Sequence, residues 1–251
     1  MAPARHLLGF TGLRAFTATE LRVQLHERTV VLTSMIVQVV LLIFVSILAP
    51  TLLAVALVGA LVFSMFALGQ RVQNEAAYIR VDHKLNELYL ASPLKPEAYF
   101  LGMSLGILIA FLPPILVLAV VAELVIHMSA VTALAIVLGA AAVWLFSCST
   151  GYIVSTWFKD MRAIWPYSSL FYNLFGVLPP VFYPLARVAP AWQPVALLVP
   201  PSAATGLIQW TMGDASLSLG EVVLAAGVLA VGALGTFALA VYWARRTVRE
   251  R

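Results

Sequence analysis

The sequence predicts an all-α polytopic membrane protein with six transmembrane helices. Its 251 residues are 62% hydrophobic and only 10% charged, whereas an ordinary soluble domain has about 25% charged residues. The mean hydropathy is +0.98. Since so few charges cannot cover a globular surface in water, we expect much of the chain to lie in a bilayer. Long runs without Asp, Glu, Lys or Arg occupy 29–70, 98–122, 124–158, 163–186 and 222–244.

The thickness of the bilayer divides these runs into spans. A hydrocarbon core of about 30 Å needs roughly 20 apolar residues in a helix. The first run is twice that long, and Pro50 near its middle predicts a break between two spans. We expect one transmembrane domain over 1–251, because the short loops leave no room for a second domain of about 100 residues. The predicted spans are Val30–Ala49, Thr51–Gly69, Ala98–Ala122, Thr132–Phe158, Ala163–Phe182 and Val222–Ala244.

The basic residues orient these spans, since Lys and Arg collect in cytoplasmic loops. With the N-terminus in the cytoplasm, 14 of the 15 basic residues lie on the cytoplasmic side, and Arg187 alone lies outside. We therefore expect a multi-pass protein of the plasma (inner) membrane with both termini cytoplasmic. Topology and contact with anionic lipid then explain the isoelectric point of about 9.4, and no nucleic acid partner is needed.

Two cytosolic segments have amphipathic character. Residues 1–28 mix apolar side chains with Arg14, Glu20 and Arg22, which predicts a helix lying at the inner membrane interface. Between the second and third spans, 71–97 contains a predicted helix from Glu75 to Leu90. Its apolar arc consists of Ala77, Tyr78, Val81, Leu85, Leu88 and Tyr89, with Ile79 misplaced on the polar side.

The helix over 75–90 fits two hypotheses equally well. It could rest on the lipid surface, or it could dock onto a cytosolic partner. Pro93 and Pro96 end the helix before the third span.

Signals for catalysis are weak. The pentapeptide Gly102-Met103-Ser104-Leu105-Gly106 matches the nucleophile elbow of serine hydrolases, which needs a strand, a sharp turn and a helix. Because it lies in an apolar helix, we favour Gly102 and Gly106 as positions where a neighbouring helix approaches closely. An intramembrane hydrolase using Ser104 is the alternative. No His, Cys, Asp or Glu cluster has metal-ligand spacing.

The sequence contains no phosphate-binding loop, which needs Gly-Lys followed by Ser or Thr. The three lysines are Lys84, Lys95 and Lys159, and none follows a glycine. If ATP drives this protein, we expect ATP and Mg²⁺ to bind another polypeptide, so this chain needs no cofactor of its own.

Two further stretches form an ordered series of motifs. The first is Asn86-Glu87-Leu88-Tyr89-Leu90-Ala91-Ser92-Pro93-Leu94 with Tyr99-Phe100-Leu101-Gly102. The second is Leu178-Pro179-Pro180-Val181-Phe182-Tyr183-Pro184-Leu185, followed by Pro190-Ala191-Trp192 and Leu198-Val199-Pro200. Together with the six spans, they resemble the type-2 ATP-binding-cassette (ABC) transporter permease family, of exporter type. The lysine that the family carries after the glycine is Met103 here, so its role is not carried over.

This resemblance implies a permease subunit that is not itself an enzyme. Such permeases form homodimers, or heterodimers with a related subunit, and sit on two cytosolic ABC ATPase subunits. In the family, the helix between the second and third spans is a coupling helix that rests in a groove of the ATPase. The resemblance assigns that role to Glu75, Tyr78, Val81, Leu85, Glu87 and Leu88.

The resemblance also implies a re-entrant segment over 187–220, before the last helix. Its prolines prevent one continuous helix, and its apolar stretches Val195–Val199 and Thr205–Trp210 suit a membrane interface.

The spans also indicate a class of substrate. None carries a charge at mid-depth, so a pathway between them would be apolar and aromatic. Phe171, Tyr172 and Phe175 on the fifth span are candidates to line it. A hydrophobic or amphiphilic substrate (drug, lipid or lipid-linked molecule) is favoured over a small ion. An ATP-independent membrane carrier or assembly factor is the alternative.

Overall fold

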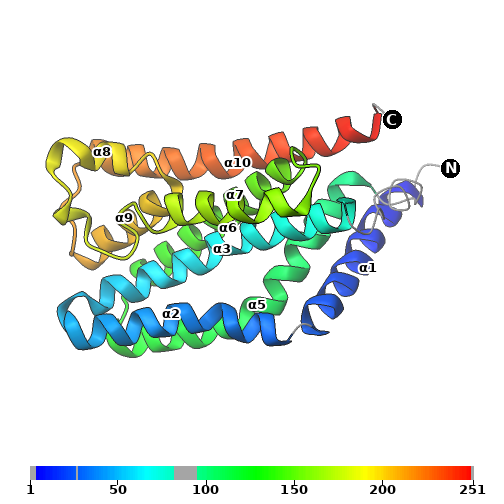
Figure 1. Ribbon diagram of the computed structural model, residues 1–251. Helices are drawn as coiled ribbons and strands as arrows, with labels where there is room; N and C mark the ends of the chain where they lie inside the picture. The colour runs from blue at the N-terminus through cyan, green and yellow to red at the C-terminus, as the bar shows by residue number, and fades with distance from the viewer. Residues whose placement is uncertain (1–3, 27, 82–94, 250–251) are drawn as a thin grey trace.

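The computed structural model describes residues 4–26, 28–81 and 95–249. These residues contain no strand and form an elongated bundle in which long helices run back and forth along one direction (Figure 1). The helices are α1 (Ala4–His26), α2 (Arg28–Leu48), η1 (Pro50–Leu52), α3 (Leu53–Val81), α5 (Pro96–Ile126), α6 (Ala130–Ser155), α7 (Met161–Gly176), η2 (Leu185–Arg187), η3 (Pro190–Trp192), α8 (Gln193–Ala196), α9 (Pro200–Met212) and α10 (Leu219–Arg249).

Within the described residues, four helices are long and apolar enough to cross a membrane. They match the second, third, fourth and sixth predicted spans, so the all-α class is confirmed, and the four helices fit a membrane protein. The first predicted span coincides with α2, which ends just before Pro50. The four helical stretches are Pro50–Val81, Glu97–Ile126, Ala130–Ser155 and Leu219–Arg246.

The fifth predicted span is shorter than expected. We placed it over 163–182, but α7 ends at Gly176 after 16 residues. Such a helix is about 24 Å long, which is less than the hydrocarbon core of about 30 Å. Pro179 and Pro180 supply the reason, because a residue that precedes proline is pushed out of the helical conformation.

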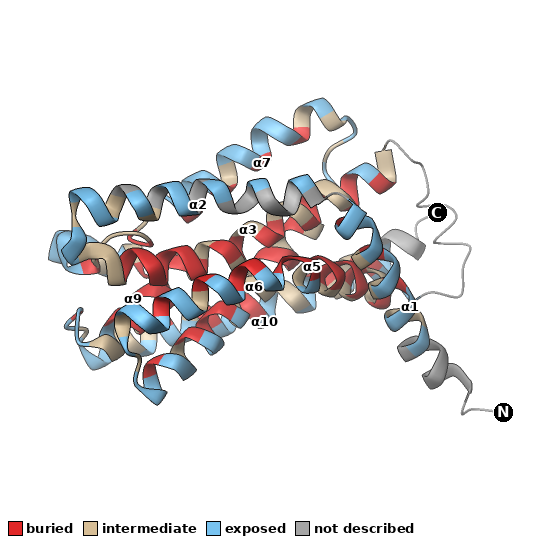
Figure 2. Cartoon of the chain, turned by 90° about the horizontal axis from the view of Figure 1, so that it is seen from below, coloured by how far each residue is buried: buried red, intermediate tan, exposed pale blue. Residues whose placement is uncertain are grey.

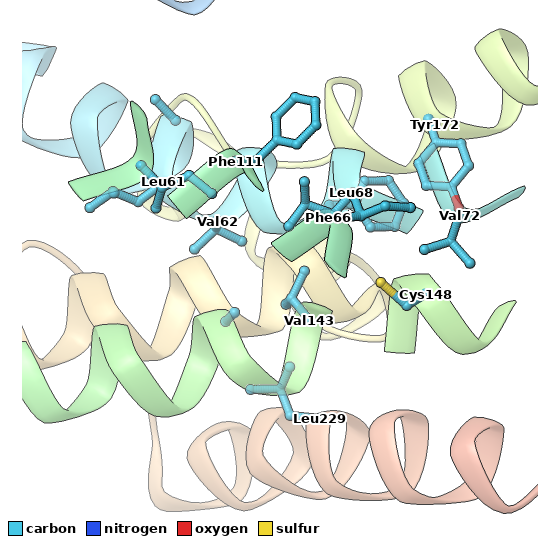
Figure 3. Packing of buried hydrophobic residues seen from close by; sticks show 14 of the residues in the cluster. Leu61, Val62, Phe66, Leu68, Val72, Phe111, Val143, Cys148, Tyr172 and Leu229 are labelled. Carbon is cyan, nitrogen blue, oxygen red and sulfur yellow. The ribbon is translucent and has the colours of Figure 1, made fainter. Parts of the chain in front are cut away.

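The central helix of the bundle is α3. It packs most extensively against α6 and also contacts α5, α7 and α9, so its middle is buried while α2 and α7 expose their outer sides (Figure 2). The hydroxyl of Ser147 on α6 donates to the backbone carbonyl of Phe66 on α3. The core around this contact includes Leu61, Val62 and Val143 (Figure 3).

The first helix packs against protein along one side. Phe16, Glu20 and Gln24 are buried, and the Gln24 amide donates to the Glu20 carboxylate at 2.8 Å. They share the side of α1 that packs against α5, where Gly102 and Gly106 lie. A Cβ added at Gly106 would be 2.6 Å from the Cβ of Glu20. The sequence predicted this helix but placed it at the membrane interface without this contact.

Residues 177–218 form a compact cap of short helices. We expected 205–210 to lie at a membrane interface, yet the structure buries Thr205, Gly206, Ile208 and Gln209. Small side chains at the start of α9 allow this close packing against α6 and α10. The Thr205 hydroxyl donates to the carbonyl of Pro180 at 3.0 Å, which fixes α9 to the chain that follows α7.

Candidate functional site

The two ends of the bundle differ in charge. At one end, which we call the basic end, α3, α6 and α10 finish and α1, α5 and α7 begin (Figure 1). The opposite end carries Glu123, Asp214 and Glu221, and among the described residues there Arg187 is the one Lys or Arg. The basic end carries Arg80, Lys95, Lys159, Arg162, Arg245 and Arg246.

Arg80 joins α3 to the end of α6. Its guanidinium donates to the backbone carbonyl of Ser155 and, at 2.8 Å, to that of Phe158. The last carbonyls of a helix lack partners within the helix, and a cation is favoured beside them. Arg80 thus satisfies two carbonyls at the α6–α7 junction.

Two further contacts tie the same end together. The indole of Trp243 on α10 donates to the Thr156 hydroxyl at 3.0 Å. Arg245 forms an ion pair with Glu97, the second residue of α5, at 3.0 Å. The α6–α7 junction is therefore held by α3 and α10, and α10 is held by α5.

The predicted coupling residues fall in two groups. Glu75, Tyr78 and Val81 lie on the last turns of α3, whereas Leu85, Glu87 and Leu88 lie outside the described residues. Tyr78 is 41% exposed, so part of its side chain lies at the surface.

The helical-wheel assignment of Ile79 was wrong. Ile79 is only 5% exposed and shares a buried stripe with Val72 and Ala76. The spacing i, i+4, i+7 places these three side chains on one helix face. The helical wheel treated 75–90 as a separate helix. Because α3 continues without a break from the predicted span to Val81, its contacts with the neighbouring helices decide which of its side chains are buried.

An apolar groove lies between α7 and α10. Its volume is about 780 Å³, within the range of about 300–1,000 Å³ that is usual for ligand pockets. Its lining consists of two residues from each of α6 and α7, three from 198–200 and seven from α10. Phe171 and Phe175, two of the three predicted lining residues, are among them. None of the described residues in the lining is charged.

Tyr172, the third predicted lining residue, lies in the core. It is 2% exposed, its ring lies 4.8 Å from that of Phe66, and its hydroxyl donates to the carbonyl of Ser147 at 3.4 Å. Figure 3 shows the ring beside Phe66 and Val72. Consecutive helical residues point about 100° apart, so Phe171 and Tyr172 face different neighbours.

Sequence reasoning missed the α10 side of the groove. Gly227 lines it, and a Cβ added there would meet nothing within 4 Å. At Gly232, an added Cβ would lie 3.5 Å from Pro200 and 3.6 Å from Phe146. The glycines of α10 were the available signal in the sequence. Only the fold shows which helices face them.

Ser104 has the environment of a packing residue. It lies within α5, is 1% exposed, and its hydroxyl donates to the carbonyl of Phe100 at 3.0 Å, one turn earlier. A hydrolase elbow needs an exposed Ser on a sharp turn, which this helix does not provide. The described residues hold no group of three His, Cys, Asp or Glu able to bind a metal.

Comparison with known proteins does not identify the chain, because no protein family matches it and no curated protein is significantly similar.

Proposed function

We propose that this chain is the transmembrane subunit of an ABC exporter, which moves a hydrophobic or amphiphilic substrate and is driven by separate ATPase subunits. The length of α3 carries the proposal. Its 29 residues rise about 44 Å, against a hydrocarbon core of about 30 Å. The helix is thus long enough to emerge from the membrane at the basic end, where it leads into 82–94, the segment with the coupling motif.

Arg80 gives this segment a mechanical connection to the rest of the bundle. It lies two residues before Asp82 and holds the carbonyls of Ser155 and Phe158. A displacement of the segment by an ATPase would therefore reach the α6–α7 junction. Since α7 also lines the apolar groove, ATPase closure and substrate movement would be coupled through this junction.

The charge distribution supports the proposed orientation. Under the positive-inside rule, the basic end faces the cytoplasm, so that both termini are cytoplasmic in the plasma (inner) membrane. ATP and Mg²⁺ would bind the ATPase subunits, because this chain has no Gly-Lys-Ser/Thr loop. By resemblance to the family, the full assembly contains two permease subunits, identical or related, and two ATPases.

A re-entrant segment is part of the proposal. Pro200, the first residue of α9, packs at Gly232, near the middle of α10 (Leu219–Arg249). If α10 crosses the membrane, α9 begins at mid-depth and returns toward the end of the bundle opposite the basic end. The hydroxyl of Thr205 and the amide of Gln209 bond to backbone groups of that irregular chain, as buried non-helical backbone requires.

ATP binding and transport by the purified chain test this function. We expect the isolated chain neither to bind nor to hydrolyse ATP, and its complex with a P-loop ATPase from native membranes to hydrolyse ATP faster when amphiphilic substrate is added. Stoichiometric ATP binding by the isolated chain would contradict the proposal. So would ATP-independent transport by the chain alone in vesicles, which would indicate a carrier.

A further inference from the structure

We propose that the α7–α10 groove holds one acyl chain of a membrane phospholipid, which enters sideways from the bilayer. The inference deepens the proposed function, on which its meaning for transport rests, because it names the part of an amphiphile that the groove accepts. It depends on the shape, lining and membrane depth of the groove.

The lining is suited to hydrocarbon. Phe146, Phe171 and Phe175 supply rings, and α10 supplies aliphatic side chains such as Val231. The two hydroxyls in the lining belong to Thr150 and Thr236, and Thr236 donates to the carbonyl of Gly232 at 2.6 Å within its own helix. With no charged side chain among the described lining residues, the groove offers no counter-charge to a phosphate or an ammonium group. It therefore accepts the chain of a lipid and leaves the headgroup outside.

The groove is long and runs lengthwise along α10. Along α10 the lining extends from Val223 to Thr236, which corresponds to about 20 Å of helix. The groove is open along this length, because Val223 and Val231 line it and are also exposed. An extended acyl chain is far thinner than a helix and can follow the groove lengthwise.

The groove opens toward the bilayer. Val223 and Val231 line it and are also 63% and 74% exposed, so the same side chains belong to the outer surface of α10. An apolar cavity does not hold water, and an empty groove forfeits dispersion contacts along its whole wall. In a membrane, the molecule that is present at this depth and can restore those contacts is a lipid chain.

The groove covers only part of the membrane. Thr236, its last lining residue on α10, precedes Arg245 at the basic end by nine residues, or about 14 Å of helix. The groove thus lies mostly in the half of the bundle remote from the basic end and ends just past the middle of α10. The chain it holds comes from the leaflet at that side, which is the outer leaflet under the proposed orientation.

Photolabelling tests the inference on the chain alone. The protein is reconstituted in phosphatidylcholine nanodiscs that contain a phosphatidylcholine with a diazirine in the middle of one acyl chain. After irradiation, mass spectrometry locates the labelled residues. We expect labelling of the groove residues of α7 and α10 to exceed that of Val137 and Leu138, exposed residues of α6, by about fivefold or more, because only the groove immobilises a chain.

A matched pair of variants tests whether the groove causes this enrichment. Gly227→Leu places a side chain in the groove from a position where an added Cβ meets nothing within 4 Å. Ala226→Leu adds a similar side chain at the neighbouring exposed position, which is outside the lining. We expect Gly227→Leu to reduce groove labelling to the level of the α6 surface and Ala226→Leu to leave it unchanged. Equal thermal stability of the two variants shows that neither has lost the fold.

Three results would overturn the inference. Uniform labelling around the bundle would mean that lipid is only a surrounding layer. Enriched labelling that survives Gly227→Leu would place the chain elsewhere. A disulfide-linked dimer of Val231→Cys in a Cys148→Ala background would show that a second copy covers the groove. No ATPase is present in these experiments, so a negative labelling result would not contradict the exporter proposal. Conversely, a failure of the chain to bind an ATPase would not contradict the lipid site.

Discussion

Replacement of Arg80 by alanine should loosen the junction between α6 and α7. The guanidinium donates to the carbonyl of Ser155 and, at 2.8 Å, to that of Phe158. A hydrogen bond to a charged group contributes about 1.5–3 kcal/mol, but Arg80 is half-buried, and water replaces part of this when the side chain is removed. We therefore expect Arg80→Ala to lower the free energy of unfolding by about 2 kcal/mol.

The assay is thermal unfolding of the purified chain in one fixed detergent. A loss of about 2 kcal/mol corresponds to a decrease in Tm of about 4–8 °C for a chain of this size. Arg80→Lys is the matched control. It keeps the charge, but an ammonium is a compact donor that does not reproduce the planar fork of the guanidinium. We expect a decrease in Tm about half as large.

Arg80→Ala with the Tm of the wild type would refute this reasoning, because the two carbonyls would then be satisfied equally well without the guanidinium. A full loss in Arg80→Lys would show that the planar geometry matters more than the charge. In the ATPase complex, Arg80→Ala should reduce the stimulation of ATP hydrolysis by substrate while the subunits still co-purify, since the coupling segment itself is unchanged.

Two further predictions concern packing and topology. Gly106→Ala should lower the free energy of unfolding by about 1–3 kcal/mol, because the new methyl group forces α1 away from α5. Gly235→Ala, where an added Cβ meets nothing within 4 Å, should be neutral or stabilising. Equal Tm values for the two variants would contradict the close contact between α1 and α5. In a Cys148→Ala background, cysteine at Asp214 should react with an impermeant maleimide in intact cells and cysteine at Lys159 should not. Labelling of both positions from outside would refute the orientation.

The long apolar helices could be predicted because their signal is carried by many residues at once. A charge-free run of more than 20 apolar residues favours a membrane span, although the run over 163–186 shows that this signal alone does not give a full-length helix. The predicted span Thr132–Phe158 and the helix Ala130–Ser155 therefore differ by only a few residues at each end. The break at Pro50 was equally visible, since proline removes a backbone donor and kinks or breaks a helix.

Local chemistry and apolar composition gave conflicting signals at the end of α7. The run continues to Ala186, which favoured a longer span, but Pro179 and Pro180 stop the helix at Gly176. The proline signal was present in the sequence but is not decisive by itself, since α5 continues through Pro113 and Pro114.

The groove could be predicted only in part. Phe171 and Phe175 were identified because an apolar pathway needs large apolar side chains on one helix. The α10 wall depends on which helices meet, and hydrophobic periodicity carries no information about that when a helix is apolar on all sides. Tyr172 was wrongly included among the lining residues for the same reason. Its ring enters the core because it packs against Phe66, which the sequence does not show.

Co-purification of the ATPase with a Leu85→Asp variant tests the central claim most directly. Leu85 lies outside the described residues, and its place on the docking face rests on the apolar arc that includes Tyr78. An unpaired carboxylate buried in that contact costs several kcal/mol, which corresponds to a loss of affinity of about a hundred-fold or more. We expect Leu85→Asp to insert in the membrane but to lose the ATPase and transport together, while Asn86→Ala on the polar face retains both. Recovery of the ATPase at wild-type yield with Leu85→Asp would contradict the account.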